Sequence, residues 1–235
     1  MASTRRLATA AGICFFVTHV TSIGGLALYG PVLHDPGFVL GPGPDTRVLL
    51  GALSEVLLVL GIVGTAVALY PVARRHSEAG AVGYLGLRVL EAAVIAVGIV
   101  ALLAVVTLRR DAAGGQDAAA LTTTAGALVA VHDWTFLLGP NFVCGANTTV
   151  IAYVVYRSGL VPRPVAVLGL IGGPLIFASA VAVLLGRYEQ LSGWGALTAL
   201  PVFAWELALA GRLVARGFTS ARHPARAAEQ AAVPA

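Results

Sequence analysis

Six apolar stretches, each long enough to cross a lipid bilayer, constrain this chain more than any other feature. A membrane-spanning helix needs about 20 predominantly apolar residues. The six stretches are residues 7–29, 47–70, 80–108, 134–156, 165–185 and 193–214. Only 11% of the 235 residues are charged, whereas a soluble domain carries about 25% charged residues. The sequence therefore predicts an all-α, polytopic membrane helix bundle whose main partner is the lipid bilayer.

Residues 118–138 are the one ambiguous segment. Apolar residues recur there at helical spacing, at Leu121, Ala125 and Leu128, and three threonines lie opposite them. This pattern is typical of an amphipathic helix, so we predict an interfacial helix that leads into the fourth span. The alternative is that residues 118–138 themselves cross the bilayer and turn at residues 139–141, which gives seven spans.

The distribution of arginine favours six spans. Cytoplasmic loops of membrane proteins carry an excess of basic residues. With six spans and both termini in the cytoplasm, the cytoplasmic side holds Arg5, Arg6, Arg74, Arg75, Arg157, Arg163, Arg212, Arg216, Arg222 and Arg226, and the outer side holds Arg47, Arg109, Arg110 and Arg187. Seven spans would move the last six of the cytoplasmic group outside and remove the bias. We therefore predict a bacterial cytoplasmic (inner) membrane protein.

Two further predictions follow from composition. Residues 1–216 form one transmembrane helical domain, and residues 217–235 hold too few apolar residues to fold, which predicts a disordered cytoplasmic tail. The net charge of +4 does not indicate nucleic acid as a partner, because the arginines lie between apolar segments and set the membrane orientation.

Three glutamates and one arginine lie deep inside the predicted spans, away from their ends: Glu55, Arg88, Glu91 and Glu206. Each costs roughly 2.5–3.5 kcal/mol at the centre of a membrane helix, so they are expected to be paired, protonated or in contact with water. Arg88 and Glu91 are three residues apart and share a helix face, which predicts an ion pair. Because three carboxyl groups face one arginine, at least one glutamate is expected to be neutral or hydrogen-bonded to His19. A purely structural ion pair explains Arg88 and Glu91 equally well.

The stretch HDWTFLLGPNFVCGANTT, residues 132–149, carries a second set of polar groups. Asp133 is interpreted either as a helix cap or as a partner of His132 at the entrance of a site. Pro140 frees a backbone carbonyl one turn earlier; Asn141 and Asn147 either satisfy such groups or line a cavity along a discontinuous helix. Helical spacing places Asp133, Pro140 and Asn147 on one face.

Metal and cofactor chemistry is not predicted. The histidines lack HxxxH or HExxH spacing, and the chain has no P-loop, no Rossmann fingerprint and no haem-attachment motif. We therefore expect no metal and no cofactor.

Three strings carry a resemblance to a known family. They are YLGLRVLEA at residues 84–92, HDWTFLLGPNF at residues 132–142 and YRSGLVPRPVAVLGLIGGP at residues 156–174. The sequence resembles an uncharacterised bacterial membrane family, the domain of unknown function 4386 family, from the first span to about Gly217. The resemblance implies a polytopic membrane protein and, because the family has no assigned activity, it implies no function.

The polar residues of the spans are expected to share one site between helices. The candidates for ligand binding or proton coupling are His19, Glu55, Arg88, Glu91, His132, Asp133, Asn141, Asn147 and Glu206. The first hypothesis is that this site binds a small molecule or an ion for transport or sensing, with a small apolar or amphiphilic compound as a possible ligand. The alternative is a membrane-embedded enzyme that acts on a lipid or isoprenoid-like substrate by acid/base catalysis. A third possibility is a structural subunit whose polar residues only fix helix packing; the sequence specifies neither catalytic residues nor an oligomeric state.

Overall fold

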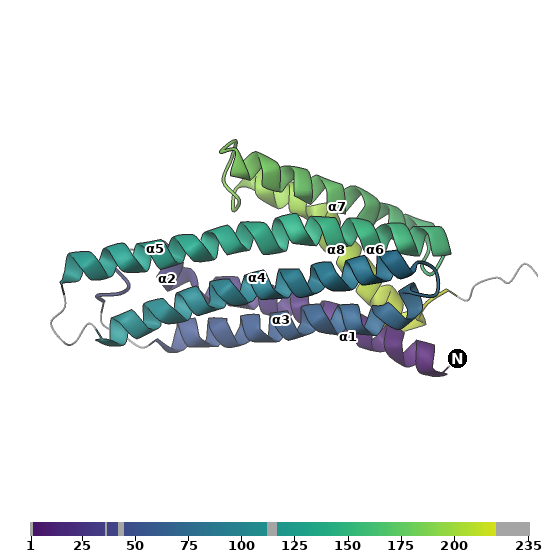
Figure 1. Ribbon diagram of the computed structural model, residues 1–235, viewed down its shortest axis with the longest axis horizontal. Coiled ribbons are helices and arrows are strands. Elements are labelled where there is room, and N and C mark those ends of the chain that lie inside the picture. The colour runs from purple at the N-terminus through teal and green to yellow at the C-terminus, as the bar shows by residue number, and fades with distance from the viewer. Residues whose placement is uncertain (1, 36, 42–44, 112–116, 220–235) are drawn as a thin grey trace, which may run out of the picture.

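The structure is a computed structural model that describes residues 2–35, 37–41, 45–111 and 117–219. Within these residues the chain is helical, and no strand is present (Figure 1). The helices are α1 (Ala2–Leu28), α2 (Gly30–His34), α3 (Thr46–Ala73), α4 (Glu78–Asp111), α5 (Ala118–Leu137), the π-helix η2 (Leu138–Val143), α6 (Cys144–Ser158), α7 (Arg163–Leu184) and α8 (Gly193–Arg216). Most of the predicted tail, residues 220–235, lies outside the described residues.

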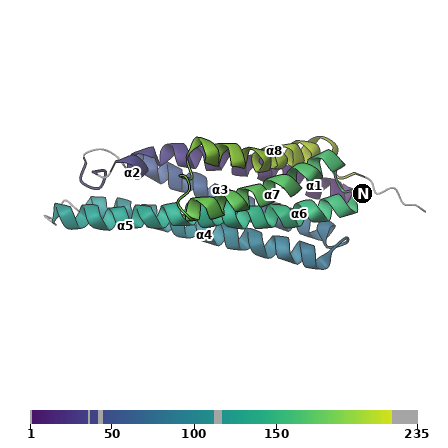
Figure 2. The same ribbon diagram turned by 90° about the horizontal axis from the view of Figure 1, so that it is seen from above.

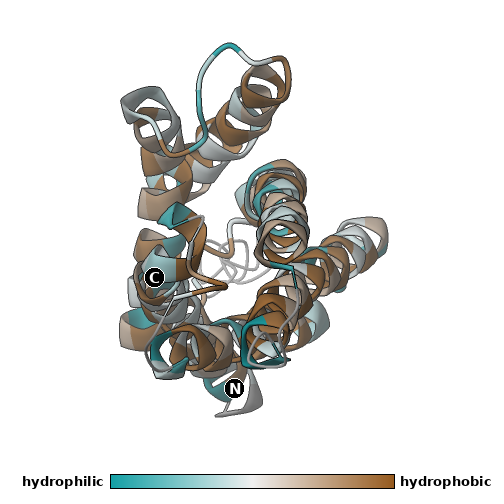
Figure 3. Ribbon diagram, turned by 90° about the vertical axis from the view of Figure 1, so that its left-hand side faces the viewer, coloured by the Kyte–Doolittle hydropathy of each residue, from teal (hydrophilic) through white to brown (hydrophobic). Residues whose placement is uncertain are grey.

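The long helices form a ring in which each packs against its neighbours. α1 packs against α3 and α8, α4 packs against α3, α5 and α6, and α7 packs against α6 and α8. Toward the end of the bundle that carries α2, α7 and α8 diverge from α4 and α5 (Figures 1 and 2). Hydrophobic residues follow the outer sides of most helices (Figure 3). Large exposed apolar side chains such as Val20, Leu60 and Val100 are what a lipid-facing surface requires.

Residues 118–158 form one continuous helix of 41 residues, through α5, η2 and α6. At about 1.5 Å per residue this helix is about 60 Å long, twice the roughly 30 Å hydrocarbon core of a bilayer. A helix is therefore present over residues 118–137, but its apolar and polar residues are not separated onto opposite faces, and it continues into the fourth span instead of forming a separate element. The turn that seven spans require at residues 139–141 is replaced by a π-helix. Among the residues that the structure describes, six helices are long and apolar enough to cross a membrane.

Small residues bring α6, α7 and α8 into close contact. A Cβ atom on Gly173 would lie 2.8 Å from the carbonyl oxygen of Gly145, and one on Gly169 would lie 2.6 Å from the ring of Trp205. Such contacts are closer than side chains tolerate, so the glycines allow the helix backbones to approach, as they do in membrane bundles. They hold together the half of the ring that carries Asn147 and Glu206.

Arginine side chains tie the helix ends together. Arg5 donates to the carbonyl oxygens of Val214 and Ala215, at 2.7 and 3.2 Å, and so caps the last turn of α8. At the opposite end of the bundle, Asp45 accepts from Arg109 at 3.2 Å and from Arg110 at 2.9 Å. These contacts connect α1 to α8 and α3 to α4, the helices that surround the cavity described next.

Candidate functional site

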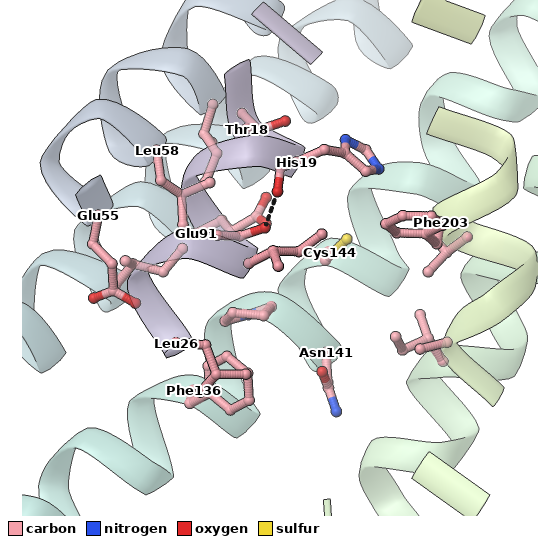
Figure 4. A pocket seen from close by; sticks show the side chains of 18 of the residues that line it. Thr18, His19, Leu26, Glu55, Leu58, Glu91, Phe136, Asn141, Cys144 and Phe203 are labelled. Atoms are coloured by element: carbon pink, nitrogen blue, oxygen red, sulfur yellow. Dashed lines mark hydrogen bonds between the residues drawn. The ribbon is translucent and has the colours of Figure 1, made fainter. Parts of the chain in front are cut away.

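A cavity of about 520 Å³ lies inside the ring, between α1, α3, α4, α5, η2 and α8 (Figure 4). Its walls are mainly apolar and include Ile23, Leu26, Ile95, Phe136 and Phe203. α5 packs mainly against α4, whereas α8 packs mainly against α1 and α7, and side chains of both α5 and α8 line the cavity. The same cavity is also lined by four charged side chains, Glu55, Arg88, Glu91 and Glu206.

Arg88 on α4 holds the centre of the charged network. Its Nη1 donates to Glu91 Oε2 at 3.0 Å, its Nη2 donates to Glu206 Oε1 at 2.7 Å, and its Nε donates to the hydroxyl of Tyr84 at 3.1 Å. Tyr84 and Glu91 are four and three residues from Arg88, so one face of α4 presents all three. The Arg88 side chain is only 4% exposed, and its guanidinium also lies over the ring of Phe15 at 5.4 Å. One buried guanidinium thus binds two carboxylates and one hydroxyl.

Two further side chains extend this network. Asn147 on α6 donates from Nδ2 to Glu91 Oε2 at 2.7 Å, so Glu91 accepts two hydrogen bonds on one oxygen. His19 on α1 lies with Nε2 3.8 Å from Glu206 Oε2, which is too long for a hydrogen bond. The other ring nitrogen of His19 lies 2.8 Å from the carbonyl oxygen of Phe15. This contact requires a proton on Nδ1, and Nε2 is the nitrogen that faces Glu206.

A second polar group lies on another part of the cavity wall and is built around Glu55 on α3. Glu55 is 6% exposed, and the hydroxyl of Tyr29 and the ring of His132 are its polar neighbours. The Tyr29 hydroxyl lies beside the Glu55 carboxyl without a fully formed hydrogen bond. His132 in turn contacts Asp133 through Nδ1 at 3.3 Å, and the Asp133 side chain is 65% exposed. Figure 4 shows Glu55 apart from Glu91 and Cys144.

The π-helix η2 replaces the predicted break at Pro140. A proline has no N–H group, so the carbonyl of the residue four positions earlier, Phe136, is left without its helical partner. Gln190, in the connection between α7 and α8, donates to that carbonyl oxygen at 3.1 Å. The interpretation that Asn141 or Asn147 satisfies the freed carbonyl is therefore wrong, because Gln190 fills this role. Asn147 instead satisfies a neighbouring helix, α4, by donating to Glu91.

Two predictions about Asp133 are also wrong. Asp133 does not cap a helix, because it lies in the middle of the continuous helix and the N-cap is Asp117, whose side chain accepts from the backbone N–H of Ala119 at 3.0 Å. Asp133 also does not share a face with Asn147, since Asp133 is exposed and Asn147 is fully buried. The π-helix inserts extra residues into one turn and so rotates the face that follows it.

Seven of the nine candidate residues line the cavity: His19, Glu55, Arg88, Glu91, His132, Asn141 and Glu206. Asn147 lies behind Glu91, and Asp133 points away from the cavity. The sequence reasoning missed Tyr84, whose spacing from Arg88 was a usable signal, and Tyr29 and Gln190, which no local pattern marks. Within the described ranges, no group of three His, Cys, Asp or Glu side chains is arranged to hold a metal ion.

Six long apolar helices arranged in a ring define a polytopic helical membrane protein. The chain belongs to the family described as a domain of unknown function, DUF4386, whose model matches residues 10–217. The match covers α1 from residue 10 and all of α3 to α8, and it confirms the resemblance carried by the three sequence strings. No curated protein and no solved structure matches the chain.

Proposed function

We propose that this protein binds a small amphiphilic molecule in its cavity, for transport across the membrane or for sensing. The observation that supports this function is the cavity of about 520 Å³, which has mainly apolar walls and Glu206 among its lining residues. The Glu206 side chain is 14% exposed, whereas that of Arg88 is 4% exposed. An apolar part of the ligand would contact Phe136 and Phe203, and its polar end would meet Glu206.

The volume of the cavity argues against a purely structural role for the charged residues. Ligand sites commonly measure about 300–1,000 Å³, and this cavity falls within that range. Polar groups that only fix helix packing need a partner on a neighbouring helix and no empty space beside them. Here Arg88, Glu91 and Glu206 have such partners and also line the cavity.

A membrane-embedded enzyme that acts on a lipid or isoprenoid-like substrate is the second candidate. The mainly apolar walls favour it, because they suit a lipid tail. In that reaction a protonated glutamate of the cavity would act as the acid and His132, which Asp133 contacts from outside, as the base. Recovery of a converted product, and not of an unchanged compound, distinguishes this candidate from binding.

The experiment compares small molecules extracted from the purified wild type and from Ala199→Trp, by liquid chromatography and mass spectrometry. Ala199 lines the cavity and is partly exposed, so an indole at this position fills part of the space. We expect one or a few compounds that are enriched in the wild type and lost in the variant. Equal content in both proteins would contradict ligand binding in this cavity.

We also propose that both termini lie in the cytoplasm, with the helix ends that carry Arg74 and Arg163 facing the same side. The excess of arginine at these ends supports this orientation. In a variant without Cys14 and Cys144, a cysteine introduced next to Arg163 should react with an impermeant thiol reagent only from the cytoplasmic side. A cysteine next to Arg187 is the matched control and should react only from outside; the reverse pattern would contradict the orientation.

A further inference from the structure

The cavity carries more carboxyl groups than fixed positive charges. Its described lining contributes three carboxyl groups, Glu55, Glu91 and Glu206, and one guanidinium, that of Arg88. Arg88 is already shared between Glu91 and Glu206. Among the described residues that line the cavity, His19 and His132 are the other side chains that can carry a positive charge. When both are neutral, two negative charges remain without a cation. The Tyr29 hydroxyl and the Cys144 thiol, which also face these carboxyls, add no positive charge. A cavity with this balance attracts positive charge.

Glu55 is the carboxyl group with the weakest compensation. It is 94% buried and lines the cavity, and its polar neighbours are the hydroxyl of Tyr29 and the ring of His132. Neither is a fixed cation. A buried carboxylate is costly unless a positive charge or several hydrogen-bond donors compensate it. The compensation that the described side chains do not provide must come from a proton or from a bound cation.

Aromatic rings in the cavity wall favour a bound cation. Phe203 is 40% exposed, lines the cavity and packs against the ring of His19 with the ring centroids 4.7 Å apart. Phe136 lines the cavity from α5. The face of an aromatic ring attracts a cation, more strongly when the cation is desolvated. Carboxylates and ring faces together are the groups that recognise an organic ammonium ion.

We infer that the ligand of this cavity is a lipophilic organic cation, such as a substituted ammonium ion with apolar groups, whose charge faces Glu206 and whose apolar groups contact Phe136 and Phe203. This inference rests on the proposed function and specifies its ligand class. Glu55, in the same cavity, provides a second carboxylate that an extended or dibasic cation reaches. An anion of the same size and shape meets the three carboxyl groups and is rejected by repulsion.

Tetraphenylphosphonium and tetraphenylborate test this directly, because they share a shape and carry opposite charges. Equilibrium dialysis measures the binding of both probes to the detergent-purified protein. The same measurement on Ala199→Trp gives the background that comes from partitioning into the micelle. We expect saturable binding of the phosphonium that Ala199→Trp abolishes, and binding of the borate that is weaker by about tenfold or more. Glu206→Gln should weaken phosphonium binding by about tenfold, while Glu189→Gln, which changes an exposed carboxyl outside the cavity, should leave it unchanged.

A substitution at the exposed edge of the cavity tests the same inference if Glu206→Gln does not fold. Ala196 lines the cavity and is exposed, so Ala196→Lys should fold. It should weaken phosphonium binding and strengthen borate binding. Ala196→Gln should also fold and should leave the binding of both probes unchanged. Borate binding equal to or tighter than phosphonium binding, and blocked by Ala199→Trp, would overturn the cation inference and leave the binding function standing. Absence of binding by both probes would overturn the inference as well, and equal extracts from wild type and Ala199→Trp would then also remove the proposed function.

Discussion

Glu91→Gln and Glu206→Gln, made singly and together, test whether Arg88 needs one counterion or two. In the structure the two carboxylates contact different Nη atoms of Arg88, at 3.0 and 2.7 Å. Each single variant therefore leaves Arg88 with one ionised partner. The double variant leaves the buried guanidinium with the Tyr84 hydroxyl and two neutral amides.

The size of the effect follows from the charges. At an effective dielectric of about 20, unit charges about 4 Å apart attract by roughly 4 kcal/mol. Two carboxylates on one guanidinium lie about 5–6 Å apart and repel each other by about 3 kcal/mol on the same scale. Removing one carboxylate loses about 4 kcal/mol of attraction and relieves about 3 kcal/mol of repulsion, a net cost of about 1 kcal/mol. Removing both costs about 5 kcal/mol, so the coupling between the two substitutions is about 3 kcal/mol.

Unfolding of each variant by sodium dodecyl sulfate in mixed micelles, followed by circular dichroism, measures the four free energies. Glu189→Gln removes an exposed carboxyl and serves as the control, with an expected change within about 0.5 kcal/mol. Independent substitutions add to within about 0.3–0.5 kcal/mol. Additive costs for Glu91→Gln and Glu206→Gln would refute the shared counterion.

Other parts of the bundle give further predictions. Gly173→Ala should lower the free energy of unfolding by about 1–3 kcal/mol, because its methyl group meets the Gly145 carbonyl. Gly86→Ala is the control and should cost nothing, since no heavy atom lies within 4 Å of the added methyl group. Equal melting temperatures for the two variants would contradict the close packing. Tyr188→Phe removes the 2.7 Å hydrogen bond to Ser179 and should cost about 0.5–1.5 kcal/mol, measured in the same micelles; no change would show that this contact does not hold the α7–α8 connection.

Local sequence patterns predict the spans and one ion pair, because both depend on neighbours along the chain. An apolar run of about 20 residues has few alternatives to a membrane helix, and Arg88 with Glu91 lies within one helical turn. The pairing of Arg88 with Glu206 joins residues 118 positions apart. It depends on α8 closing the ring beside α1, and no local pattern specifies the order of helices in a bundle.

The sequence also did not predict the π-helix or the direction of the helix face that follows it. Regular helical spacing places Asp133 and Asn147 on one face, whereas the structure exposes the first and buries the second. Pro140 signals an irregularity but does not distinguish a break from a π-helix. The distinction depends on Gln190, which is distant in sequence and satisfies the freed carbonyl of Phe136.

Contact with water at one position on α8 tests most directly whether the charged side chains share an enclosed polar space. Ala199 lines the cavity, while its neighbour Leu200 is 57% exposed on the outer surface of the bundle. A cysteine is introduced at each position in turn, in a variant without Cys14 and Cys144, and a nitroxide is attached to it. The protein is placed in lipid nanodiscs in deuterated water. Electron spin echo modulation then reports deuterium near the label. The account predicts strong deuterium modulation at position 199 and little at position 200. Equally weak modulation at both positions would contradict a polar cavity inside the ring of helices.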